Sequence, residues 1–179
     1  QDVLVRANNL AMIPKGYYAA YGSTTFREKL QKQISRVPYG YSNGDFVDGD
    51  LSFDLGDTGG VITYRILLYD FDYTTGGEVL TDTLPAGMEL LDVMLVSHDA
   101  SNMEKYTALD TDYYLDVSKT QNADGTTALR FTLSHLNYVG PGKVLGIYYS
   151  CSVANDPNWA ELPDGGEISV CGLPPCTET

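Results

Sequence analysis

Cations are scarce in this sequence of 179 residues, and that shortage excludes several classes of protein. Only 11 Lys and Arg stand against 24 Asp and Glu, so the formal net charge at pH 7 is −13. Binding to nucleic acid or to an anionic membrane surface needs clustered cations, and we expect neither partner. No apolar run reaches membrane-spanning length, so membrane insertion is not expected. High acidity fits a solvated surface, cation binding or an extracellular environment, and we expect a secreted or cell-surface protein.

Catalytic motifs are also missing. The two histidines, His98 and His135, lie far apart in the sequence, with no Cys or Asp motif around them. No nucleophile elbow, phosphate-binding loop or metal-ligand helix is present. Two carboxylates could be paired for glycoside hydrolysis, but nothing in the sequence selects a pair. We therefore expect that the protein is not an enzyme.

Cysteine is rare and odd in number, with Cys151, Cys171 and Cys176. At least one thiol must be free, buried or paired with another chain. Cys151 has inward parity on its predicted strand and fits a plain buried thiol. Cys171 and Cys176 could close a small loop, or one of them could reach a neighbouring subunit. Cys171 is opposite in parity to Ile168 and Val170, which disfavours a bridge to Cys151.

The residues that the sequence does contain favour β-structure, because it has 14 tyrosines, 18 glycines and little long helical periodicity. Period-2 alternation is clearest between Val61 and Val96, where three strands are predicted at 61–70, 78–84 and 90–96. About eight strands, with turn signals every ten residues or so, predict an all-β, immunoglobulin-like β-sandwich. The segments expected to be irregular are a polar loop at 39–60 and a connection at 98–112 that could include a helical turn. The other predicted strands begin at residues 1 and 30 and span 113–117, 128–133, 143–155 and 167–171.

The expected organisation is one domain with short additions at both ends. Residues 29–172 form the sandwich, 1–28 an N-terminal extension and 173–179 a tail, which Pro174-Pro175 keeps out of the sheet. The first strand either pairs within its own domain or adds to the sheet edge of a neighbouring copy.

The segment from Ser23 to Val37 fits two patterns. Phe26, Leu30 and Ile34 fall at helical spacing, whereas a strand from Leu30 would bring Leu30 and Ile34 to the inner face. We favour a helical turn to about Glu28, followed by a strand.

Three polar residues share the parity of the apolar residues on their own predicted strands: Lys32, Asp82 and Asn155. Polar groups buried in this way must find one another or leave costly unsatisfied groups. One interpretation is a buried Lys–Asp ion pair with Asn as a hydrogen-bond partner. The other places all three at solvated strand ends.

The segments GDTGGVITYRILL, VLTDTLPAGMELLDV and GKVLGIYYSCSVAND resemble the β-sandwich modules of Gram-positive pilins, adhesins and related bacterial surface proteins. The resemblance covers roughly residues 28–172. One group of these modules forms an intramolecular isopeptide bond, and a sister group with the same DTLPAG signature does not. The bond-forming group implies that Lys32 joins Asn155 with help from Asp82. Lys29 competes with Lys32 for the first position.

The chemistry of such a bond would be internal to the domain. Burial favours the neutral amine of Lys32 as a nucleophile, and it raises the pKa of Asp82, which can then protonate the Asn155 amide. Ammonia leaves and a covalent crosslink remains. By the loop-entropy argument used for disulfides, the crosslink would stabilise the domain by about 4–5 kcal/mol.

An acidic segment between Asn43 and Asp50 is a weak candidate calcium site. Asp45, Asp48 and Asp50 alternate with glycine turns, and oxygen ligands of this kind suit Ca²⁺. The full calcium-loop spacing and its closing Glu are missing, so a solvated acidic turn is the competing interpretation. No other cofactor is expected.

Two functional hypotheses follow. The first is an extracellular structural subunit that assembles with copies of itself into a surface fibre, pilus or surface layer. Its assembly surfaces would be the N-terminal strand, the Tyr17–Tyr21 segment and the cysteines near the C-terminus. The alternative is a monomeric adhesin or carbohydrate-binding module of a bacterial surface protein, with surface tyrosines that stack on the ligand.

Overall fold

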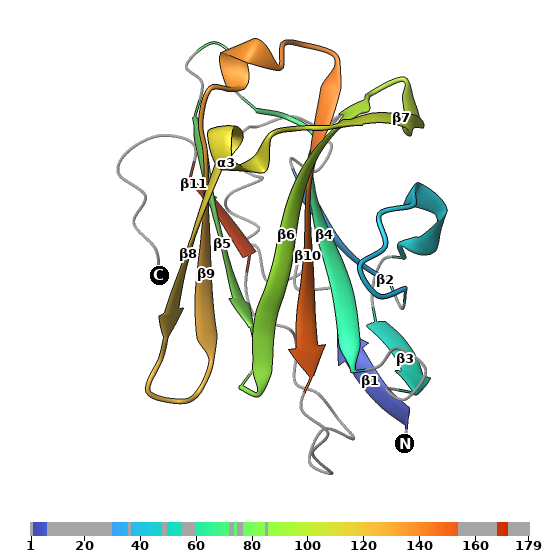
Figure 1. The fold of residues 1–179 in the computed structure, drawn as a ribbon, viewed down its shortest axis with the longest axis vertical. Helices are drawn as coiled ribbons and strands as arrows, with labels where there is room; N and C mark the ends of the chain where they lie inside the picture. The colour runs from blue at the N-terminus through green and yellow to red at the C-terminus, as the bar shows by residue number, and fades with distance from the viewer. Residues whose placement is uncertain are drawn as a thin grey trace, which may run out of the picture.

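Two antiparallel β-sheets pack face to face in the computed structural model of this protein (Figure 1). The structure describes residues 2–6, 30–35, 37–47, 50–54, 60–71, 74, 77–84, 86–153 and 168–171. For four parts of these ranges, 2–6, 50–54, 153 and 168–171, it describes the backbone only.

The larger sheet has five strands in the order β2-β4-β10-β6-β7, and every neighbouring pair is antiparallel. Its strands are β2 (Leu30–Ser35), β4 (Val61–Leu68), β10 (Lys143–Val153), β6 (Met88–Asp99) and β7 (Asn102–Ala108). The segment from Leu30 to Ser35 is therefore a strand, as the favoured interpretation predicted. The helical turn expected before it lies outside the described residues.

The smaller sheet has four strands in the order β11-β5-β9-β8, again all antiparallel. They are β11 (Ile168–Cys171), β5 (Glu78–Leu84), β9 (Thr127–Leu133) and β8 (Leu115–Gln121). The predicted all-β, immunoglobulin-like β-sandwich is thus confirmed.

A separate two-stranded sheet pairs the start of the chain with a segment of the same chain. β1 (Asp2–Arg6) runs antiparallel to β3 (Asp50–Asp54). The predicted polar loop at 39–60 is therefore wrong at β3. Leu51 and Phe53 alternate there with Asp and Ser, and the weight of acids around them hid the alternation.

The core lies between the two large sheets and is built from alternate residues of each strand. On β5 the burial pattern is strictly alternating, and Leu80 and Leu84 are fully buried. The predicted inner face of β10 is confirmed through Tyr149 and Cys151, which are both completely buried. Burying a large apolar side chain contributes about 1.5–3 kcal/mol, so these faces dominate the stability of the sandwich.

The outer face of the larger sheet is covered over β4, which is buried on both faces. The cover is the segment 37–47, which contains the 3-10 helix η2 (Asn43–Asp45). Ile34 and Val47 exchange two backbone hydrogen bonds of 3.0 Å, and these tie the segment to the free edge of β2. Phe46 is buried beneath the segment.

The irregular connection predicted at 98–112 is wrong where β6 continues to Asp99 and where β7 follows, and the helical turn that it could include is α3 (Thr111–Tyr114). Nearly every residue of β7 is exposed, so the strand lacks the apolar face on which period-2 alternation depends. The strand predicted at 113–117 begins two residues later, at Leu115, because Tyr113 and Tyr114 belong to the short helix α3 (Thr111–Tyr114).

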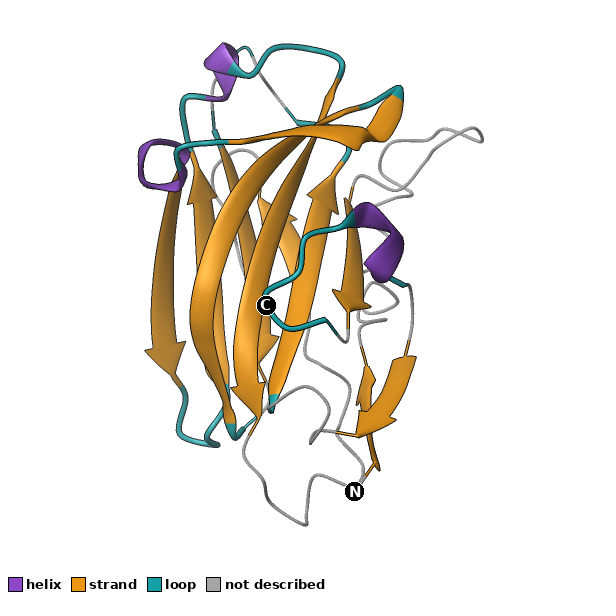
Figure 2. Ribbon diagram, turned by 45° about the vertical axis from the view of Figure 1, so that its right-hand side comes forward, coloured by secondary structure: helices purple, strands orange, loops and turns teal. Residues whose placement is uncertain are grey.

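Two helical turns lie at one end of the sandwich, outside the strand layers (Figure 2). They are α3 and the 3-10 helix η3 (Leu136–Tyr138). The turn predicted at 122–125 is confirmed by positive φ at Gly125 and by a hydrogen bond from its N–H to the carbonyl of Asn122. None of the helices in the described ranges is long and apolar enough to span a membrane.

Candidate functional site

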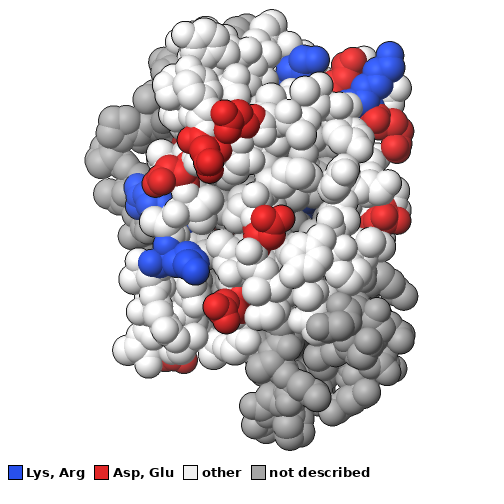
Figure 3. Space-filling model, viewed as in Figure 1, with Lys and Arg blue, Asp and Glu red and all other residues white. Residues whose placement is uncertain are grey.

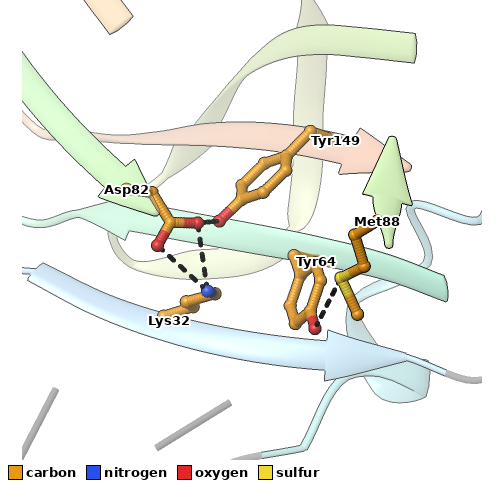
Figure 4. Close-up of polar contacts among 5 residues, drawn as sticks. All are labelled: Lys32, Tyr64, Asp82, Met88 and Tyr149. Carbon is orange, nitrogen blue, oxygen red and sulfur yellow. Dashed lines mark hydrogen bonds and ion pairs between the residues drawn. The ribbon is translucent and has the colours of Figure 1, made fainter. Parts of the chain in front are cut away.

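Lys32 and Asp82 meet in the centre of the core, one from each large sheet. Lys32 Nζ lies 3.0 Å from Asp82 Oδ2 and 3.3 Å from Oδ1, and neither side chain is exposed to solvent (Figure 4). Of the two interpretations drawn from the sequence, the buried ion pair holds for these two residues. Asn155 and the competing Lys29 lie outside the described residues.

Two tyrosines surround the ion pair (Figure 4). Tyr149 donates its hydroxyl hydrogen to Asp82 Oδ2 over 2.5 Å, and the Tyr64 ring centroid lies 4.4 Å from Lys32 Nζ. The two rings stack at 5.5 Å with an interplanar angle of 29°. The sequence analysis missed both tyrosines, although their inward parity was a signal, because a buried Tyr hydroxyl needs a partner.

Burial sets the protonation chemistry of this centre. Desolvation raises the pKa of Asp82, against the lowering effects of Lys32 and the Tyr149 hydrogen bond. Desolvation also raises the pKa of Tyr64 and Tyr149, and that of Cys151 to about 12. Such a sealed centre can hold an ion pair or undergo one internal reaction, but it offers no surface to an external substrate.

The structure does not bring the three acids of the candidate calcium site together among its described side chains. Asp45 is exposed in η2, Asp48 lies outside the described residues, and only the backbone of Asp50 is described, in β3. Among the side chains that the structure describes, no group of three or more His, Cys, Asp or Glu is arranged to hold a metal ion.

The cysteines are partly accounted for. Cys151 is buried with a free thiol, as predicted. The backbone of Cys171 lies in β11, paired with Val79 of β5. Its side chain and all of Cys176 lie outside the described part of the chain, so their pairing stays a prediction.

A second feature is exposed, at the end of the sandwich that carries α3 and η3. Here Tyr113, His135 and Tyr138 form a group that we call the end platform. The rings of Tyr113 and His135 stack at 4.2 Å with an interplanar angle of 16°, and Tyr138 lies 6.3 Å from Tyr113 and 6.4 Å from His135. Tyr113 is 44% exposed and Tyr138 is 67% exposed.

The backbone holds the end platform in place. His135 is in the left-handed region, with φ 59° and ψ 24°, which costs a non-glycine residue about 1–3 kcal/mol. Its Nδ1 lies 3.1 Å from the carbonyl oxygen of Tyr113, and a carbonyl only accepts, so Nδ1 carries the hydrogen and donates it. The N–H of Ser134 donates to the carbonyl of Tyr114 over 2.8 Å. The two helical turns are therefore fastened to each other beneath the rings.

Comparisons with known proteins return few matches. No family model matches this chain, and no curated protein does. Among solved structures, the chain is similar to a CBM3a-L domain with flanking linkers from scaffoldin cipA of the cellulosome of Clostridium thermocellum. That match has 8% sequence identity, covers 83% of this chain and 88% of the other, and has a TM-score of 0.37.

A second solved structure is the family 3a carbohydrate binding module from the same scaffolding. It matches at 8% identity over 79% of this chain and 94% of the other, with a TM-score of 0.36. Both TM-scores are low, and neither match carries an argument about the function of this chain.

Proposed function

We propose that this chain is a non-catalytic carbohydrate-binding module of a secreted or cell-surface protein, and that the end platform contacts the sugar. The observation that carries the proposal is the exposed, stacked group of Tyr113, His135 and Tyr138. Large rings that stay exposed on a rigid frame are typical of binding surfaces.

The chemistry of the end platform fits a sugar ring. One face of a pyranose presents C–H groups that pack on an aromatic ring, while its hydroxyl groups need hydrogen-bond partners. Asp112 and Asn137 are exposed beside the platform residues in the sequence and supply such partners. Because the backbone already fixes the rings, little conformational entropy is lost on binding. The net charge of −13 favours a neutral polysaccharide over an anionic one.

The sheet edges give less support to the predicted fibre, pilus or surface-layer subunit. The edge strand β7 carries Glu104 and Lys105, and the edge strand β8 carries Asp116 and Lys119. Charged side chains of this kind, Lys above all, discourage strand addition from another chain. The edge of β2 is bridged to Val47 of the same chain. These three of the four edges of the two large sheets favour a monomeric module.

Binding isotherms on neutral polysaccharides test the proposal. We would measure the wild type and Tyr138→Ala on cellulose, chitin, xylan and mannan, and expect about tenfold weaker binding of the variant on the preferred polymer. The matched control is Leu91→Ala, which removes another exposed apolar side chain, on β6, and should bind as the wild type does. Retention on none of the four, together with ordered filaments in electron microscopy, would favour the fibre subunit instead.

An internal crosslink is a second, separate proposal. We infer from the contact between Lys32 Nζ and the Asp82 carboxylate that an amine and an acid are positioned for the isopeptide chemistry expected from the sequence. Intact mass with disulfides accounted for is the test. A deficit of one ammonia that disappears in Lys32→Ala supports a bond to Asn155, and the full theoretical mass rules it out.

The strand register makes the Asp82 carboxyl a competitor of Asn155 for the amide bond to Lys32. Lys32 pairs with Ile66, which pairs with Ile147, and β10 ends six residues later at Val153. About 20 Å of strand therefore separates the level of Lys32 from the end of β10. A deficit of one water rather than one ammonia would identify the Asp82 carboxyl as the partner.

A further inference from the structure

A second group of exposed rings lies on the outer side of the larger sheet. Tyr41, in the covering segment 37–47, and Tyr106, on β7, are 43% and 46% exposed. Their rings meet edge to face, with centroids 5.8 Å apart and an interplanar angle of 79°. We call this pair the side corner, because one ring forms a floor and the other a wall.

Each of the two tyrosines has a polar residue two positions away in the sequence. Asn43 follows Tyr41, Glu104 precedes Tyr106, and Asn43 Nδ2 donates to Glu104 Oε1 over 3.2 Å. This bond joins the covering segment to β7 a second time. It also places an amide and a carboxylate, both able to bond to hydroxyl groups, on the two segments that supply the rings.

The side corner stands on a buried polar layer. His98, on β6, is the register partner of Tyr106, and the centroids of the two rings are 5.9 Å apart. Its Nε2 is 2.6 Å from the Tyr148 hydroxyl. The same hydroxyl accepts a hydrogen bond of 3.0 Å from Arg65, whose guanidinium lies 4.5 Å from the centre of the Phe46 ring. These contacts join both segments of the corner to the sheet, so the two rings are held rather than loosely exposed.

Backbone strain is a further observation on this segment. Tyr39 has φ 55°, and in the described part of the chain it shares a positive φ only with His135 among non-glycine residues. The Tyr39 N–H donates to Thr63 Oγ1 over 3.0 Å, which holds the strained residue on the sheet. Strained residues cluster at ligand-contacting sites. Here Tyr39 lies two residues before Tyr41 of the side corner, and His135 belongs to the end platform.

We propose that the side corner is a second binding site for a neutral sugar, separate from the end platform. An aromatic floor and wall with an amide and a carboxylate beside them match the C–H face and the hydroxyl groups of a pyranose. Glu104 and the exposed Asp45 disfavour an anionic ligand. Two sites on one rigid module bind a long polysaccharide chain, or two chains, more tightly than either site alone.

Titration with soluble oligosaccharides tests the second site. The probes are cellohexaose, xylohexaose, mannohexaose and chitohexaose, added to the wild type, Tyr41→Ala, Glu104→Gln and Tyr138→Ala, with the binding stoichiometry measured by calorimetry. We expect two sites per wild-type chain for one of the probes and one site in Tyr41→Ala. Glu104→Gln keeps both rings and should weaken the second site about tenfold.

The variants separate this proposal from the proposed function. Unchanged stoichiometry and affinity in both Tyr41→Ala and Glu104→Gln would overturn the second site, even if Tyr138→Ala lost binding and so upheld the end platform. Loss of binding in Tyr41→Ala alone would uphold the side corner and contradict the end platform. If none of the four probes binds to the wild type, the side corner is not a sugar site. Leu91→Ala serves again as the control.

Discussion

At the scale of single residues, the ion pair of Lys32 and Asp82 is the most demanding feature of the core. Both side chains are fully buried, so each charge depends on the other and on the Tyr149 hydroxyl for compensation. Parity on the strands predicted that both residues face inward. It could not show that Tyr149 would complete the site, because a tyrosine on an apolar face looks like ordinary core.

Removing one partner should therefore be far more costly than removing both. Asp82→Ala leaves the Lys32 amine buried without its acid, and we expect a loss of about 3–5 kcal/mol in the free energy of unfolding. The double variant Lys32→Met, Asp82→Leu should be much closer to the wild type or more stable. Urea denaturation of the three proteins measures this. If both variants lose the same amount, the pair is not a mutually dependent unit.

His98 predicts a pH dependence of stability. Burial lowers the pKa of His98 below its ordinary value of 6.5, so the unfolded chain binds the proton more readily. This contribution to stability is present above pH 6.5 and is lost as the pH falls toward the folded-state pKa. The raised pKa of Asp82 acts with the opposite sign, so a variant at His98 is needed to isolate the effect.

The comparison is between the wild type and His98→Gln in urea at pH values from neutral down to acidic. The wild type should lose stability relative to the variant as the pH falls. Parallel curves over that range would show that His98 does not titrate differently in the folded and unfolded chains.

At the scale of elements, the sequence predicted the strands β5 and β10, which have at least one buried face, and missed β7, which has none. β5 and β10 alternate strongly, and both were located within a few residues. β7 has almost no buried residue, and its place as an edge is set by pairing with β6, which the sequence alone does not reveal. The end platform was missed for a related reason. It joins α3 to η3, and its rings meet only once β8 and β9 are paired.

His135→Asn should separate stability from binding at this end of the sandwich. Asn tolerates the left-handed backbone and keeps a hydrogen-bond donor, so we expect a change in the free energy of unfolding of less than about 1 kcal/mol. The ring that stacks on Tyr113 is lost, so sugar binding should fall about tenfold. Denaturation and a binding isotherm on the same preparation check both parts. Full binding by a normally stable variant would exclude His135 from the site.

At the scale of the whole molecule, the face drawn in Figure 3 carries acidic groups that are spread over it rather than gathered in one patch. Exposed acids lie close in sequence to both aromatic groups, with Asp112 at the end platform and Glu104 at the side corner, and no group of acids among the described side chains is arranged to hold a metal ion. A surface of this kind suits a neutral ligand, because stacking and hydrogen bonding carry the affinity and long-range electrostatics carry little of it.

Salt dependence follows from that charge distribution. Binding to a neutral polysaccharide should change little as the ionic strength rises from low to high, because few charges meet in the interface. Polygalacturonate, an anionic polymer, should not be retained at low salt. Affinity electrophoresis at two salt concentrations measures both. Strong retention of the anionic polymer at low salt, lost at high salt, would mean that a cationic surface carries the binding instead.

The most direct test of the carbohydrate-binding proposal is a nuclear magnetic resonance titration with the best-binding neutral hexasaccharide, followed at the ring protons of the end platform. The proposal predicts that the resonances of Tyr113, His135 and Tyr138 shift together and saturate at one ligand concentration. Those of buried rings such as Tyr64 and Tyr149 should stay in place. Saturable binding that leaves all three platform resonances unmoved would contradict it.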